Sequence, residues 1–310
     1  MKNLAIFCTL FFLTTSSFAQ RSVSVTIDDV PNTHLYKQQN FNSFLQRKLD
    51  SLRIPVAIFI NEGNLQLTNE VDKNKDLLKT WISKPYVTPG NHGFEHKNYA
   101  EVGFEAFKND VVQGELLTRK FAKELNKESK YFRFPFNGAG NDSLEQVTAL
   151  NFLADRNYIS TPFTVESEDW LYAILYEDAI SAKDKKRAEW IGNQYVDFTV
   201  RLFSYFDSLS TQLYNRPIKQ IYLCHDNSLN ADYLPRIIDE LKKKEYQFIS
   251  LDQAMSDPVY EFQLYYYGKA GFSWISRWIP DVVLRRKMMQ SEPLNPEIQS
   301  AFEERNKKKN

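Results

Sequence analysis

The sequence holds four histidines, and two of them, His92 and His96, stand four residues apart in the segment PGNHGFEH. Positions i and i+4 of a helical turn lie on one face, where two imidazoles can bind the same metal ion. The alternative for this spacing taken alone is a pair of partly exposed surface histidines. The pair is therefore a candidate metal site that needs a further ligand from elsewhere in the chain.

An adjacent pair of carboxylates, Asp28 and Asp29, follows a run rich in Val and Thr at Ser22–Ile27. Neighbouring side chains of a strand point to opposite faces, so the pair needs a local turn to share one site, and Pro31 suits such a turn. A metal ion would relieve the repulsion between the two charges, with one carboxylate as ligand and the other left as a base. The alternative is a solvated loop or a helix cap.

Three further polar clusters each contain a group that could take part in catalysis. Arg133 lies in an apolar run, where a buried arginine needs a carboxylate partner. The acidic segment at residues 166–169 comes directly before Trp170, and it could instead be the start of a helix. His225 ends another apolar run and is a candidate proton donor or acceptor. The alternatives are a structural ion pair for Arg133 and a core position for His225.

Short β-like runs alternate with helix-like runs, which predicts parallel β-α-β units. The β-like runs are Ser22–Ile27, Pro55–Ile60, Tyr86–Thr88, Tyr131–Phe136, Tyr158–Val165, Ile218–Cys224 and Phe248–Leu251. The helix-like runs are Phe41–Leu52, Leu77–Ile82, Phe104–Leu125, Ser143–Arg156, Glu177–Leu213 and Asp232–Lys244. About seven parallel strands predict an α/β fold, a distorted (β/α) barrel. The polar clusters fall at the C-terminal ends of these strands, the rim where such barrels build active sites.

Residues 1–19 have the layout of a secretory signal peptide. Lys2 supplies a positive charge, Leu4–Leu13 is almost wholly apolar, and small residues at positions 17 and 19 precede Gln20. A membrane anchor is the alternative, but a bilayer needs about 20 apolar residues and this run is shorter. No later segment of the sequence is long and apolar enough to span a membrane. We therefore expect a secreted or periplasmic protein of the cell envelope, with no transmembrane segment after cleavage.

The composition disfavours two other classes of protein. The 39 basic residues balance the 39 acidic ones, whereas a nucleic-acid partner usually needs a basic face. Only Cys224 remains after the predicted cleavage, so no intrachain disulfide can form. The remaining length is ample for one large core.

Taken in order, the five polar clusters resemble the motifs of the polysaccharide deacetylases, the NodB-homology domain of carbohydrate esterase family 4. That family has T-F-D-D-G-P, H-[ST]-x-x-H, R-x-P-[YF], D-x-x-D-W and L-x-H. This chain has TIDDVP, HGFEH, RFPF, ESEDW and LCH in the same order, and the resemblance covers roughly residues 22–256. Val30, Gly93 and Glu166 depart from the pattern. Gly93 lacks a hydroxyl that usually supports the site, and Glu166 replaces the first Asp of its motif.

The resemblance implies that Asp29, His92 and His96 hold one divalent metal ion. Zinc suits this ligand set best, and cobalt, nickel and manganese remain alternatives. The resemblance also implies that Asp28 is the general base and that Arg133 orients it.

His225 is the implied general acid, and a carboxylate would keep it protonated. Asp169 is the first candidate for that carboxylate and Glu166 is the second. The backbone amide of Phe136 would help to hold the oxyanion, while Trp170 and Leu223 would flank the acetyl methyl group.

We therefore expect three parts: the signal peptide at residues 1–19, a polysaccharide deacetylase catalytic domain at residues 20–256 as the resemblance implies, and an aromatic and charged extension at residues 257–310. It implies a metal-dependent hydrolase that removes acetyl groups from N-acetylated carbohydrate, such as peptidoglycan or a chitin-like glycan. The alternatives are hydrolysis of another C–N bond, hydrolysis of an O-acetyl ester, and a glycan-binding protein without catalysis.

We predict that the mature protein starts at or near Gln20, because the small residues that precede it match a signal-peptidase site. Mass spectrometry of the protein from its natural source checks this. An intact N-terminus at Met1 would contradict the prediction.

Overall fold

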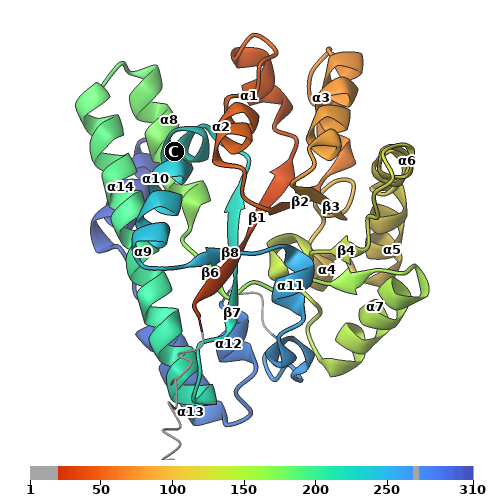
Figure 1. Cartoon of the computed structure of the whole chain (residues 1–310), viewed down its shortest axis with the longest axis vertical. Helices are drawn as coiled ribbons and strands as arrows, with labels where there is room; N and C mark the ends of the chain where they lie inside the picture. Colours follow the sequence, from red (N-terminus) through yellow and green to blue (C-terminus); the bar gives the residue numbers. More distant parts are fainter. Residues whose placement is uncertain (1–19, 268–271, 310) are drawn as a thin grey trace, which may run out of the picture.

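The computed structural model describes residues 20–267 and 272–309, and the predicted signal peptide lies outside them. The described residues form one sheet of eight strands, with helices packed around it (Figure 1). Every strand pair in this sheet is parallel, as the sequence predicted. The strands are β1 (Ser22–Val30), β2 (Val56–Ile60), β3 (Val87–Asn91), β4 (Tyr131–Phe132), β5 (Ile159–Ser160), β6 (Val165–Glu166), β7 (Lys219–His225) and β8 (Gln247–Phe248).

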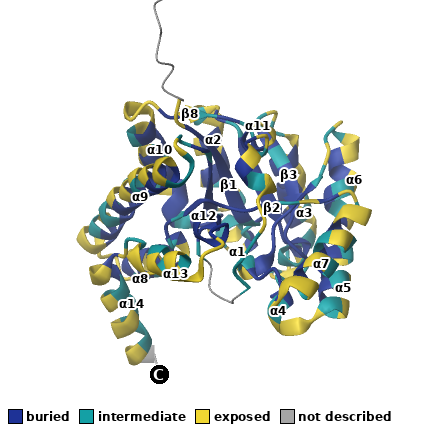
Figure 2. Ribbon diagram, turned by 90° about the horizontal axis from the view of Figure 1, so that it is seen from below, coloured by how far each residue is buried: buried dark blue, intermediate teal, exposed yellow. Residues whose placement is uncertain are grey.

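Most helices that flank the sheet are buried on the side that faces it and exposed on the outer side (Figure 2). The helix Val282–Ser291 has no buried residue. They are α1 (Thr33–Gln38), α2 (Phe44–Leu52), α3 (Val71–Ser83), α4 (Tyr99–Val102), α5 (Phe104–Gln113), α6 (Leu116–Glu124), α7 (Ser143–Asp155), α8 (Asp169–Ser181), α9 (Lys185–Tyr214), α10 (Ser228–Lys243), α11 (Leu251–Met255), α12 (Trp274–Arg277), α13 (Val282–Ser291) and α14 (Pro296–Lys309). Short 3-10 helices lie at Glu62–Gln66, Pro135–Asn137 and Pro258–Glu261. Among the described helices, none is long and apolar enough to cross a membrane.

The central strands β1, β2 and β7 are largely buried on both faces. β2 is accordingly apolar throughout, whereas β1 alternates Val and Ile with small buried Ser and Thr residues. β1 pairs with β2 on one side and with β7 on the other, and the register of β1 with β7 sets Asp28 beside His225. Because parallel strands end at the same edge, this register brings the first and last polar motifs together.

The sheet curls into an open barrel with the order β5-β4-β3-β2-β1-β7-β6, in which β8 pairs with β1. The expected single strand Tyr158–Val165 is in fact two strands, β5 and β6, at opposite ends of that order. The chain crosses between the two edges in residues 161–164, and this short span forces the edges close together. The barrel is therefore distorted, as predicted, and its opening lies at this crossing.

The C-terminal extension covers that opening. The Ser273 hydroxyl donates a hydrogen bond to the Thr164 carbonyl (2.7 Å), and the Trp274 amide donates to the Phe163 carbonyl (3.1 Å). The Trp274 ring packs edge-on against Phe163, with 5.3 Å between ring centroids. Ile298 belongs to the same buried cluster as the sheet, so the extension shares the main core.

The expected single helix Phe104–Leu125 is two helices, α5 and α6, because the chain breaks at Gly114. A Cβ atom at Gly114 would lie 2.5 Å from the backbone of Gly93, in the loop that carries the two histidines. Close packing of that loop therefore requires a glycine here.

Other boundaries also differ from the prediction. The expected strand Tyr131–Phe136 ends at Phe132, ahead of the 3-10 helix at Pro135, and the expected helix over Glu177–Leu213 is α8 and α9 with a break at residues 182–184. Of the expected strand Phe248–Leu251, only Phe248 lies in β8, since Ser250 caps α11. Local sequence patterns locate helices and strands but do not fix the residue at which each one ends.

Candidate active site

The five predicted motifs meet at the C-terminal ends of the strands, around a pocket of about 850 Å³. Nine of the candidate residues line it, namely Asp28, Asp29, His92, His96, Phe136, Glu166, Trp170, Leu223 and His225. Arg133 and Asp169 are fully buried behind this lining. His34, at the start of α1, also lines the pocket, so all four histidines of the chain lie there. His34 was not identified from the sequence, although it stands two residues after the Asp-Asp-Val-Pro-Asn segment.

Asp29, His92 and His96 form a possible metal-binding group, since their ligand atoms all lie within 4.8 Å of one another. The Asp29 Oδ1 atom lies 3.4 Å from His96 Nε2 and 3.7 Å from His92 Nε2. This oxygen is buried and has no hydrogen-bond partner. A buried carboxylate oxygen that faces two imidazole nitrogens fits a divalent cation with nitrogen and oxygen ligands.

The turn required between the two carboxylates is present. Asp29 has a positive φ of 60°, and the register of β1 with β2 is interrupted between Ile27 and Val30. This break in the strand turns Asp29 toward the histidines, while Asp28 keeps its place beside β7.

Hydrogen bonding selects the tautomer of His92. Its Nδ1 donates to the Arg133 carbonyl (2.8 Å), which leaves the lone pair of Nε2 facing Asp29. Burial lowers the pKa of His92 to about 3, so the ring is neutral at neutral pH. A metal-binding imidazole needs both properties.

The two histidines do not lie on a helical turn, contrary to the expectation from their spacing. Residues 92–98 form a loop in which Gly93 (φ 79°) and His96 (φ 58°) have positive φ. The Asp110 carboxylate accepts a hydrogen bond from the Glu95 amide (2.7 Å), and its Oδ2 lies 2.1 Å from where a Gly93 Cβ would be. Gly93 is thus suited both to the backbone angle and to the approach of Asp110.

Asp110 was not identified from the sequence. The signal for it was an acidic residue on the apolar face of α5, between Phe107 and Val111, which are both buried. A buried carboxylate on such a face has to satisfy polar groups elsewhere, here the backbone of the histidine loop.

Asp28 is buried, and its Oδ1 accepts a hydrogen bond from Arg133 Nη1 (2.8 Å). Its other oxygen, Oδ2, lies 3.6 Å from His92 Nε2. Burial raises the pKa of Asp28, and the charge of Arg133 opposes this rise. One carboxylate oxygen is therefore held by the arginine while the other points to the possible metal group.

His225, beside Asp28 in the register of β1 with β7, also lines the pocket and pairs with Asp169. Its Nδ1 lies 2.6 Å from Asp169 Oδ1, and its backbone amide donates to Asp169 Oδ2 (2.8 Å). Asn227 and Asn230 also donate to Asp169 Oδ2 (2.9 and 2.6 Å). Burial alone would lower the pKa of His225, but the Asp169 carboxylate raises it to about 10.

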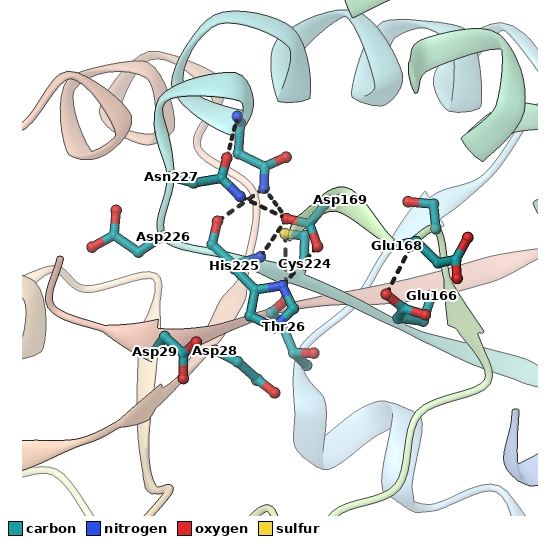
Figure 3. A network of polar contacts seen from close by, with 12 residues as sticks. Thr26, Asp28, Asp29, Glu166, Glu168, Asp169, Cys224, His225, Asp226 and Asn227 are labelled. Atoms are coloured by element: carbon teal, nitrogen blue, oxygen red, sulfur yellow. Dashed lines mark hydrogen bonds and ion pairs between the residues drawn. The ribbon is translucent and has the colours of Figure 1, made fainter. Parts of the chain in front are cut away.

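Between the two carboxylates considered for His225, the structure places Asp169 in contact with it. Glu166 instead accepts a hydrogen bond from the backbone amide of Glu168 (2.7 Å; Figure 3). Burial and the neighbouring Asp169 raise the pKa of Glu166 to about 8, and its side chain lines the pocket.

The three residues expected to touch substrate lie on different parts of the wall. Phe136 has φ 55° and packs its ring against His96, with 4.5 Å between centroids. Trp170, in the first turn of α8, is 43% exposed, whereas Leu223 of β7 is buried. The pocket lining therefore combines the possible metal group, His225 and apolar side chains.

Residues 15–154 match the family model described as polysaccharide deacetylase. A peptidoglycan-N-acetylglucosamine deacetylase of Bacillus cereus is 22% identical over 153 residues, which are 49% of this chain and 48% of that protein. The chain thus aligns with about half the length of this curated relative. Both similarities are similarities of sequence and do not depend on the fold.

Two solved structures are similar in fold. The Bc1960 peptidoglycan N-acetylglucosamine deacetylase has a TM-score of 0.51 and 17% identity, over 76% of this chain and 89% of that one. A mutant of BA3943, described as a pseudoenzyme of carbohydrate esterase family 4, has a TM-score of 0.50 and 15% identity, over 77% of this chain and 68% of that one. The family match ends at residue 154 and does not include Asp169 or His225. These two residues pair with each other, and the register of β1 with β7 sets His225 beside Asp28 of the first motif.

We predict that Asp169→Asn lowers the pKa of His225 from about 10 to the ordinary histidine value, near 6.5, or below it. The physical reason is that burial then acts without the opposing carboxylate. NMR titration of the histidine rings in the metal-free protein measures this shift. Glu166→Gln is the matched control, and the His225 pKa should stay raised in it.

The same pair predicts a pH dependence of folding. Because the folded pKa of His225 lies above the unfolded one, the pair stabilises the fold fully below about pH 6.5. That stabilisation is lost as the pH rises toward about 10. Asp169→Asn should remove this slope, and an unchanged slope would contradict the pairing.

Proposed function

We propose that the chain, whose residues 15–154 match the polysaccharide deacetylase family model, is an exported, metal-dependent hydrolase that removes acetyl groups from N-acetylated amino sugars in a glycan. One observation carries the proposal. A buried carboxylate, Asp28, is held by Arg133 between a group of Asp, His and His on one side and a protonated His225 on the other. Such a pocket offers a base, an acid and a cation site around one reacting carbonyl.

Asp29, His92 and His96 would hold a single divalent ion. The unpartnered Asp29 oxygen and the neutral His92 ring are what such an ion needs from its ligands. When bound, the ion would polarise the scissile carbonyl and lower the pKa of water at the site. Zinc suits a ligand set of one carboxylate and two imidazoles, and cobalt, nickel and manganese are further candidates.

Asp28 would accept the proton of the attacking water. Its Oδ1 is occupied by the charge-assisted hydrogen bond from Arg133, so Oδ2 is the oxygen free to act. Arg133 is buried and cannot lose its proton, so it keeps the orientation of Asp28 constant during turnover. General-base catalysis of this kind contributes about 10²- to 10⁴-fold.

His225 would donate a proton to the leaving amine. An amine has to be protonated as the C–N bond breaks, whereas an alkoxide leaves with less help. Asp169 raises the pKa of His225 to about 10 and so keeps the imidazole charged at neutral pH. An imidazole that is charged at neutral pH matters more for amide than for O-acetyl ester hydrolysis, because the departing amine depends more on protonation.

Trp170 and Leu223 would flank the acetyl methyl group, and the backbone amide of Phe136 would help to hold the oxyanion. All three residues border the pocket. The pocket volume of about 850 Å³ leaves room for sugar rings beyond the reacting group.

A non-catalytic glycan-binding protein remains the alternative of a different class. The fold does not decide between the two, because a similar fold occurs in a pseudoenzyme. The residues favour catalysis, since each group needed for the reaction is present and placed around one pocket.

The first test measures acetate release from N-acetylglucosamine oligomers, peptidoglycan and acetylated xylan. We expect release from an N-acetylated substrate that stops after chelation and returns with a divalent ion. Elemental analysis should show one ion per chain in the parent and its loss in His92→Ala. Binding of glycan without any acetate release would overturn the catalytic proposal, and release from xylan alone would favour the O-acetyl esterase.

The second test separates the two adjacent aspartates. Asp28→Asn should keep the metal and lower turnover by about 10²- to 10⁴-fold, because it removes a base and not a ligand. Asp29→Asn should weaken metal binding itself. Loss of metal from Asp28→Asn, measured by elemental analysis, would show that the two roles are reversed.

A further inference from the structure

We propose that α14 is part of the active site, because Phe302 holds the Trp170 ring in place against the pocket and thereby sets the size of acyl group that fits. This inference rests on the proposed deacetylase function. Phe302 does not line the pocket itself, so we assign it the role of a positioning residue that acts through Trp170.

Trp170 needs external support to define the pocket wall. It lies in the first turn of α8, lines the pocket and is 43% exposed. A large side chain with so much solvent contact would populate several rotamers unless a neighbour restrains it. The neighbour is Phe302, whose ring meets Trp170 edge-on at 88°, with 5.7 Å between centroids. Edge-to-face contacts of this kind favour one relative orientation of the two rings.

Phe302 is itself held in place, because α14 is fixed to the body of the protein. Ile298, one turn earlier, is 1% exposed in the main core, and Phe302 packs against that same core. The Asn295 side chain, just before the helix, donates to the Tyr172 hydroxyl (3.0 Å). At the other end Arg305 donates to Asp178 (2.7 Å).

Contacts from α14 fall on both neighbours of Asp169. The Gln299 side chain hydrogen-bonds to Glu168, and Phe302 contacts Trp170. The same short segment therefore carries the partner of His225 and the apolar wall of the pocket, and one helix of the C-terminal extension holds it from outside. This gives the extension a role in recognition.

The consequence is a specific effect on acyl selectivity. If Trp170 flanks the acetyl methyl group, a loosened ring should accept a longer acyl chain and grip acetyl less well. A general loss of stability would lower activity on both substrates equally. The ratio of kcat/KM for N-acetyl over N-propionyl oligomers of glucosamine therefore distinguishes positioning from a structural role.

The experiment compares the parent with Phe302→Ala, Phe302→Tyr and the control Arg305→Ala, which removes an α14–α8 contact far from Trp170. Phe302→Ala should raise KM for the N-acetyl substrate and lower the acetyl-to-propionyl ratio by about threefold to tenfold. Phe302→Tyr should restore the ratio, and Arg305→Ala should keep it. In a Trp170→Ala background, Phe302→Ala should have no further effect on the ratio.

A second readout does not depend on activity. The indole NMR signal of Trp170, assigned by its absence in Trp170→Phe, should broaden or shift in Phe302→Ala and stay unchanged in Arg305→Ala. If the parent is active and Phe302→Ala keeps the parent's acetyl-to-propionyl ratio, the positioning role is overturned and the deacetylase proposal stands. A parent that releases no acetate would overturn the deacetylase proposal, and an unchanged indole signal would then reject the Phe302 contact independently.

Discussion

The buried guanidinium of Arg133 is the group on which the rest of the site depends. It donates to Asp28 Oδ1, to the Thr26 hydroxyl (2.6 Å) and to the Pro162 carbonyl (3.1 Å), and it lies 4.2 Å from the centre of the Phe59 ring. The Pro162 carbonyl belongs to the crossing at the barrel opening, so Arg133 also satisfies a backbone group there. Removal of this arginine would leave a buried carboxylate unpaired, at a cost of about 3–5 kcal/mol.

The backbone of the same residue orients the His92 ring, so one position connects the proposed base, a proposed metal ligand and the edge of the barrel. Asp169 holds the His225 ring through its Nδ1 atom, as Arg133 holds Asp28. The two carboxylates thus have different electrostatic surroundings because their partners differ. Asp28 faces a permanent cation, Arg133, whereas Asp169 faces the His225 imidazole and raises its pKa. Opposed environments of this kind divide acid from base within one site.

Backbone packing supports both sides from a distance. The histidine loop owes its shape to Asp110 and to the contact between Gly93 and Gly114, which also ends α5. The extension after residue 257 lies over the barrel opening through Ser273 and Trp274 and reaches α8 through α14. Elements that carry none of the family's motifs therefore position the residues that do.

The sequence by itself determined which chemistry was available and where along the chain it lay. Apolar runs that alternate with amphipathic ones predicted a parallel sheet, and polar residues at the ends of those runs predicted one shared rim, because both patterns are local. Only the tertiary structure decided which groups meet. Arg133 reaches Asp28 across 105 residues, and Asp169, not Glu166, meets His225 across 56. The loop form of residues 92–96 and the support of Trp170 by Phe302 likewise arise from packing between distant segments, which no local periodicity encodes.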